Sequence, residues 1–164
     1  MQNNKIITQK RKILIAPSIL SADFVNLEKD IKKIECAGAD WVHIDVMDGH
    51  FVKNITIGPC VISSIRKCTK LPFDVHLMIE NTEKYVDDFI KAGADILTIH
   101  LESLSPVNER VYLNKGWGIK DNKLSEDTIK KTIALAKHIK KNNKMAGLSI
   151  NPETPIDILR RINI

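Results

Sequence analysis

The sequence has no apolar run that approaches the length of a membrane-spanning helix, which needs about 20 residues. We therefore expect no integral membrane role. The first twelve residues, MQNNKIITQKRK, also lack the apolar stretch of a secretory signal. They are basic and contain no acidic residue. We predict a disordered basic tail over residues 1–11, with an organelle transit remnant as the alternative.

Cysteine is scarce as well. Cys36, Cys60 and Cys68 are odd in number and lack the spacing of metal ligands. Secreted domains commonly carry paired cysteines, whereas unpaired thiols suit a reducing compartment. We expect a cytoplasmic protein in which these three residues, all on predicted helices, have no chemical role.

Aromatic residues make up 5% of the chain and are absent from 125–144, where lysines are most concentrated. A nucleic-acid site favours a basic stripe interleaved with aromatic side chains. The lysines instead alternate with apolar residues such as Ile129, Ile133 and Ile139 at helical spacing, which is typical of an amphipathic helix with a solvated face. With a net charge of +5, we expect no nucleic-acid partner.

The sequence does contain a regular alternation of short apolar runs and amphipathic stretches. The apolar runs predict strands at 13–19, 40–46, 73–78, 95–100 and 145–150. The stretches between them predict helices at 23–38, 58–69, 81–93, 125–144 and 154–162. Asn81 and Ser125 are the predicted caps of the third and fourth helices. The remaining segment, 103–124, is predicted as a loop.

This alternation predicts an α/β protein with a parallel sheet covered by helices. The string AGADWVHID is echoed later as AGADILTIH, which marks a repeated βα module. Both barrels and open doubly wound sheets bind ligands at the C-terminal ends of their strands. No glycine-rich phosphate fingerprint follows the first predicted strand. The preferred fold class is therefore the (β/α)8 TIM barrel.

The length of 164 residues suits one domain but is short for a whole barrel, which takes about 250 residues and at least about 200. We expect residues 12–164 to form the N-terminal part of a single TIM-barrel domain, truncated after about five βα units. The segment near 103–124 would be an insertion in it. A partner that supplies the rest of the barrel is the alternative.

Polar residues with chemical potential lie within two of the predicted strands. In WVHIDVMDGHFV, every second position is occupied by His43, Asp45 and Met47, so a strand places all three on one face. His43 and Asp45 would then lie roughly 6.5–7 Å apart along the backbone, close enough to share one cation. The segment FDVHLMI repeats this alternating pattern with His76 and Met78. The pattern predicts a metal site with a carboxylate positioned for proton transfer.

Five segments together resemble the ribulose-phosphate 3-epimerase family in order and spacing: APSILSADF, HIDVMDGHFVKNITIG, DVHLMI, KAGAD and GLSINPETP. The resemblance runs from about Lys12 to the end of the sequence and is broken mainly at 103–124. It implies a ribulose-phosphate-binding barrel that interconverts D-ribulose 5-phosphate and D-xylulose 5-phosphate in the pentose phosphate pathway. It also implies a small phosphorylated ketopentose as substrate and, at full length, a homo-oligomer.

The resemblance further implies one divalent metal ion, zinc or alternatively iron, manganese or cobalt, held by two histidines and two aspartates. Three of these ligands map to this sequence as His43, Asp45 and His76. Asp45 would also be one of two acid/base carboxylates. The substrate-contacting positions that match the family are Ser18, His76, Met47 and Met78.

These residue types suit an inversion next to a ketone. Loss of the proton from carbon 3 leaves an enediolate, which a cation bridging the two substrate oxygens stabilises. Inversion then needs one carboxylate on each side of the substrate plane. Neutral imidazoles would fix the metal, each oriented by an acceptor on its other nitrogen. Methionine thioethers add apolar contact without a competing proton.

Part of the family's pattern is missing. The second catalytic aspartate, in a Val-Asp-Gly-Gly-like segment, and the glycine-rich phosphate loops have no counterpart in the sequence. We therefore expect the isolated chain to lack epimerase turnover. A sister epimerase for allulose 6-phosphate and a non-catalytic, partner-binding barrel fragment are the alternatives. We expect His100 to be structural or to support the site, Asp48 to serve a turn, and His50 to lie at the surface.

Overall fold

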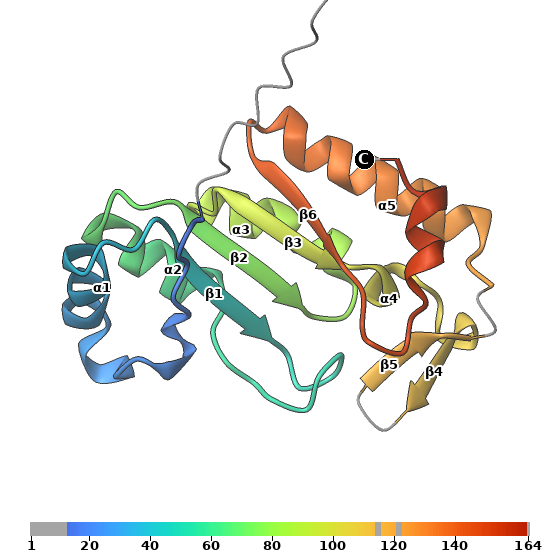
Figure 1. The fold of residues 1–164 in the computed structure, drawn as a ribbon, viewed down its shortest axis with the longest axis horizontal. Coiled ribbons are helices and arrows are strands. Elements are labelled where there is room, and N and C mark those ends of the chain that lie inside the picture. The colour runs from blue at the N-terminus through green and yellow to red at the C-terminus, as the bar shows by residue number, and fades with distance from the viewer. Residues whose placement is uncertain (1–12, 114–115, 121–122, 164) are drawn as a thin grey trace, which may run out of the picture.

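The computed structural model describes residues 13–113, 116–120 and 123–163, so the predicted tail over 1–11 lies outside the described residues. Four parallel strands form one sheet in the order β1-β2-β3-β6, with successive strands joined by helices (Figure 1). These strands are β1 (Val42–Met47), β2 (Phe73–Met78), β3 (Ile96–His100) and β6 (Met145–Ser149). The arrangement is the parallel α/β architecture of successive βα units, as predicted for part of a barrel.

The helices pack against one face of this sheet (Figure 1). They are α1 (Leu27–Cys36), α2 (Pro59–Ile65), α3 (Val86–Ala92), α4 (Leu101–Leu104) and α5 (Glu126–Lys141). Among the residues with assigned structure, no helix is both long enough and apolar enough to cross a bilayer.

Alternation along β1 and β2 separates a core face from a polar face. Val42, Ile44 and Val46 are buried under the helices, while the residues between them are partly exposed. β2 follows the same pattern, with Phe73 and Leu77 fully buried. Burial of each such side chain stabilises the fold by about 1.5–3 kcal/mol. The core therefore lies on one side, and the polar residues of both strands share the other.

The strand predicted at 13–19 is wrong as an element, although the segment runs alongside β1. It joins β1 through a single parallel bridge between Ser18 and His43. The carbonyls of Ile15 and Pro17 accept backbone bonds from residues at and before the start of β1. Pro17 has no N–H to donate, which interrupts the ladder. The pairing still places Ser18 beside the polar face.

Helix boundaries follow the predicted caps at most ends. Ser125 caps α5, since its Oγ accepts a hydrogen bond from the N–H of Thr128. Gly93 ends α3 in the left-handed region, with φ of 108°. The capping role predicted for Asn81 is wrong: its side chain makes no capping bond, and its backbone forms a left-handed turn with φ of 51°. The last predicted helix is a 3₁₀ helix over Ile156–Arg161.

The segment 103–124 was predicted as a loop, and the structure shows folded elements there. A 3₁₀ turn (Val107–Glu109) leads into an antiparallel hairpin of β4 (Arg110–Leu113) and β5 (Gly116–Ile119). This hairpin lies on the side where the parallel strands end (Figure 1).

Candidate metal centre

The three predicted metal ligands converge on the polar face of β1 and β2. The two strands pair so that Asp45 lies opposite His76. One ligand atom from each of His43, Asp45 and His76 lies within 4.8 Å of the others. Oδ1 of Asp45 is 3.2 Å from Nε2 of His43 and 3.5 Å from Nδ1 of His76. Two imidazoles and a carboxylate suit a first-row divalent ion, so the donor set fits the predicted metal.

Asp74 orients His43, and sequence reasoning missed this role. Its Oδ2 lies 2.7 Å from Nδ1 of His43, which leaves Nε2 facing Asp45. The hydrogen bond to Asp74 is the largest influence on His43 and raises its pKa above the ordinary 6.5, against the opposing effect of burial. The register that pairs His43 with Asp74 brings the two together. A carboxylate behind a metal-binding histidine is a common device for fixing the ring.

His76 is supported by another histidine. Its Nε2 lies 2.8 Å from Nε2 of His100, and the two rings stack with centroids 4.9 Å apart. Burial, followed by the electrostatic influence of the neighbouring His100, lowers the pKa of His76 below 6.5. On its other side, His100 places Nδ1 3.4 Å from Oε2 of Glu102. Glu102, which the sequence analysis did not single out, is completely buried.

Ser18 lies within this cluster through its bond to Asp45. Its hydroxyl donates to Oδ2 of Asp45 at 2.6 Å. The Oγ of Ser18 also accepts a hydrogen bond from the N–H of Leu20. The side chain therefore caps a turn and also holds the carboxylate. Met47 and Met78 lie opposite one another in the register of the two strands, on the same polar face. All of the predicted site residues are thus brought to one surface.

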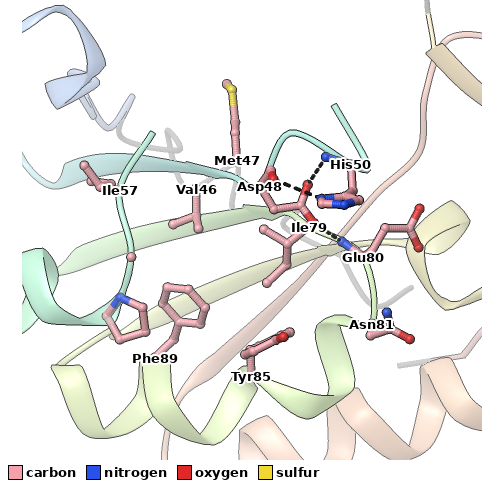
Figure 2. Close-up of a pocket in the computed structure, with 12 residues that line it drawn as sticks. Val46, Met47, Asp48, His50, Ile57, Ile79, Glu80, Asn81, Tyr85 and Phe89 are labelled. Carbon is pink, nitrogen blue, oxygen red and sulfur yellow. Dashed lines mark hydrogen bonds between the residues drawn. The ribbon is translucent and has the colours of Figure 1, made fainter. Parts of the chain in front are cut away.

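A separate cavity of about 400 Å³ lies behind the strand ends and does not include the three ligands. In Figure 2, Val46, Ile79 and Phe89 turn into this hollow, while Met47 points to the opposite side of β1. The hollow belongs to the helix-covered side of the sheet. The candidate centre is instead a partly exposed surface, with side-chain exposures of 25% for His43 and 16% for Asp45.

Asp48 serves the turn at the mouth of this cavity, as predicted. Its carboxylate accepts backbone bonds from His50, Phe51 and Glu80. Burial opposes the charge, but the three donors outweigh it and hold the pKa of Asp48 below its ordinary value. The bond to Glu80 joins the loop after β1 to the loop after β2. His50 is exposed, as expected.

No disulfide links the described cysteines. Cys36 and Cys60 are exposed thiols, and Cys68 is a buried one. None of the three lies among the residues that gather as possible metal ligands in the described part of the chain.

Comparison with known proteins places these residues in a family context. The sequence profile of the ribulose-phosphate 3 epimerase family matches residues 14–125. A ribulose-phosphate 3-epimerase of Synechocystis sp. is 45% identical over 153 residues, covering 93% of this chain and 56% of the relative. One from Bacillus subtilis is 43% identical over 150 residues, covering 92% and 58%. A chloroplastic ribulose-5-phosphate-3-epimerase of Arabidopsis thaliana is 42% identical, covering 93% and 46%. The chain spans about half the length of these relatives.

Proposed function

Because the chain belongs to the ribulose-phosphate 3-epimerase family, we propose that its polar face is the metal-binding side of an epimerase active site. The substrate would be D-ribulose 5-phosphate, inverted at carbon 3 to D-xylulose 5-phosphate. The convergence of His43, Asp45 and His76 within 4.8 Å carries this proposal. Zinc is the first choice of ion, and iron, manganese or cobalt suit the same donors.

Each residue then has a defined part. His43 through Nε2, His76 through Nδ1 and Asp45 through Oδ1 would hold the ion. When bound, the ion supplies Lewis-acid stabilisation of the negative charge that develops on the substrate oxygens. Asp45 would take the proton from carbon 3. The hydroxyl of Ser18 holds Oδ2 of this carboxylate in place.

The product requires a second acid on the opposite side of the substrate plane. Asp74 does not suit that role, because it comes from the same face of the sheet as Asp45 and is bonded to His43. The sequence contains no Val-Asp-Gly-Gly-like segment that would supply another. The 164-residue chain would therefore bind the ion without robust turnover of its own. Its unpaired cysteines support a cytoplasmic location.

A metal titration tests the proposal. Purified wild-type chain should bind about one zinc ion, as expected for one set of three ligands with an open position. His43→Gln and His76→Gln should each weaken zinc affinity by more than about tenfold, because each removes a nitrogen donor. His138→Gln, which changes an exposed histidine on α5, is the matched control and should leave affinity unchanged.

The same preparation is then assayed with ribulose 5-phosphate and zinc, coupled to a xylulose-specific reporter. We expect turnover close to background, and robust turnover by the monomeric chain would contradict the need for a second carboxylate from elsewhere. A parallel assay with allulose 6-phosphate addresses the sister activity. Wild-type chain that binds no metal would refute the metal centre and favour a non-catalytic module.

A further inference from the structure

We propose that buried Glu102 fixes the tautomer of His76, so that this imidazole presents its lone pair at Nδ1, toward the other metal ligands. The inference rests on the metal centre proposed above. It also gives the hairpin of β4 and β5 a role, since the hairpin sets the direction of the hydrogen bonds that reach Glu102. Glu102 and His100 are thus positioning residues for His76.

The chain of hydrogen bonds starts in the hairpin. The backbone N–H of Ile119, in β5, donates to Oγ1 of Thr154 at 3.2 Å. Because a hydroxyl carries one proton, Thr154 uses that proton as a donor to its other partner, Oε1 of Glu102. The backbone N–H of Asn151 also donates to Oε1, at 2.8 Å. Two donors therefore meet at one oxygen of Glu102, and Oε2 is left for His100.

Glu102 determines which nitrogen of His100 carries a proton. As a carboxylate, Glu102 offers acceptor positions only, so Nδ1 of His100, 3.4 Å from Oε2, carries the proton of that contact. A neutral imidazole has one protonated and one unprotonated nitrogen. Nε2 of His100 is then an acceptor.

The hydrogen bond between His100 and His76 sets the protonation of the candidate metal ligand. Nε2 of His100 lies 2.8 Å from Nε2 of His76, and two nitrogens at this distance need one proton between them. His76 supplies it, so its Nε2 is protonated and its Nδ1 holds a lone pair. This Nδ1 lies 3.5 Å from Oδ1 of Asp45. Two lone pairs facing each other at this separation are stabilised by a cation placed between them.

Burial protects this series of hydrogen bonds from replacement by water. Glu102 is completely buried, Thr154 is 3% exposed and His100 is 5% exposed. The side-chain amide of Asn151 also donates to the carbonyl of Trp117 at 2.7 Å, which ties the loop after β6 to the hairpin. Each group therefore keeps the partner that the fold gives it. The tautomer of His76 is set before any ion arrives.

Nitrogen NMR of the metal-free chain, labelled with ¹⁵N-histidine, tests this without any substitution. Protonated and unprotonated ring nitrogens resonate in well-separated regions. We expect a protonated Nε2 and an unprotonated Nδ1 for His76, and the reverse for His100. The opposite pattern at either ring would overturn the proposal.

Glu102→Gln should reverse the donor and acceptor roles in the hydrogen bonds between residue 102, His100 and His76. The amide oxygen of the glutamine would still accept from Asn151, but its NH₂ group would donate to Nδ1 of His100. His100 would then donate from Nε2, and His76 would carry its proton at Nδ1, on the metal side. We expect the swapped ¹⁵N pattern and a loss of zinc affinity of about 10–100-fold.

Glu28→Gln, which changes an exposed side chain on α1, is the matched control and should alter neither readout. Unchanged tautomers in Glu102→Gln would overturn the proposal. If that variant does not fold, the wild-type spectrum decides alone. Zinc binding by wild-type chain tests the metal centre separately, because the tautomer pattern is read in its absence.

Discussion

At the scale of single residues, the two histidines of the centre have opposite electrostatic surroundings. Asp74 favours the charged form of His43 and raises its pKa, whereas burial and His100 lower the pKa of His76. A cation at this candidate centre would therefore compete with a proton more strongly at His43 than at His76.

This difference predicts a pH dependence. Zinc affinity should rise with pH through a midpoint above 6.5, the ordinary value for histidine, and Asp74→Asn should move that midpoint downward. Competition with a chromophoric chelator between about pH 5.5 and about pH 8 measures it. Asp88→Asn, at an exposed aspartate on α3, is the control. An identical midpoint in Asp74→Asn and wild type would contradict the role of Asp74.

The contribution of His43 to stability changes with pH in the opposite direction to zinc affinity. Because the folded-state pKa of His43 is raised, its pairing with Asp74 stabilises the metal-free chain fully below 6.5. That contribution is lost as pH rises through the folded-state pKa. Metal affinity and the contribution of His43 to metal-free stability should therefore change in opposite directions across this window.

The candidate ligands could be read from the sequence, and most of the residues that support them could not. Period-two spacing places His43 and Asp45 on one face whatever the neighbouring strand does. The role of Asp74 depends on register, which pairs it with His43 across two strands. Glu102 depends on a long-range contact with Thr154. One signal was available for it: His100 and Glu102 repeat the histidine-x-acid spacing of His43 and Asp45.

At the scale of elements, the hairpin is attached to the sheet by a buried ion pair. Arg110, whose side chain is 4% exposed, donates to both carboxylate oxygens of Glu80, at 2.6 and 3.2 Å. Its guanidinium also lies 5.0 Å from the ring centre of Trp117. Glu80 follows β2, so the pair links the hairpin to the loop beside the metal centre.

Arg110→Ala should loosen the hairpin more than it weakens the whole fold. It leaves Glu80 without its partner, and we expect a loss of about 1–3 kcal/mol in the free energy of unfolding. Hydrogen exchange should show faster opening at the amides of β5 than at those of β1. Arg110→Lys keeps the charge but loses the paired geometry, so an intermediate effect is expected. Equal exchange rates in wild type and Arg110→Ala would refute the attachment.

The hairpin also shows where element prediction failed. Its strands are four residues each, and Gly116 and Gly118 hide the alternation in β5. The parallel strands were predicted well because each is a short segment rich in apolar residues between turn residues; β2 has the predicted bounds of 73–78. The first predicted strand failed because Pro17 has no N–H for the ladder and interrupts pairing with β1.

At the scale of the whole molecule, the candidate metal ligands lie on the polar face of β1 and β2, whereas Phe73, which Arg66 covers, lies on the buried face. Arg66 lies near the N-terminal ends of β2 and β3, where it donates to the carbonyls of Thr69 and Leu71 and to Asp95. Its guanidinium also covers the ring of Phe73 at 3.6 Å. Asp95 is 40% exposed, so its ion pair adds little. The carbonyl bonds and the ring contact supply the stabilisation.

Arg66→Ala should therefore lower the free energy of unfolding by about 1–3 kcal/mol, because two carbonyls lose their donor. Urea unfolding measures this, and zinc affinity below the transition should equal that of wild type. Arg160→Ala, at an arginine whose side chain is 85% exposed, should change stability by no more than about 0.5 kcal/mol. A large loss of zinc affinity in Arg66→Ala would contradict the separation of the two faces.

The single bridge between Ser18 and His43 has a dynamic consequence. Ile13 and Ile15 are largely exposed, so this segment is held to the edge of β1 mainly by the backbone hydrogen bonds at Ile15 and Pro17. Any local opening of these bonds would carry the Ser18 hydroxyl away from Asp45. The carboxylate proposed to move a proton would then gain and lose a donor at the pace of a local unfolding event, long before the sheet itself opens.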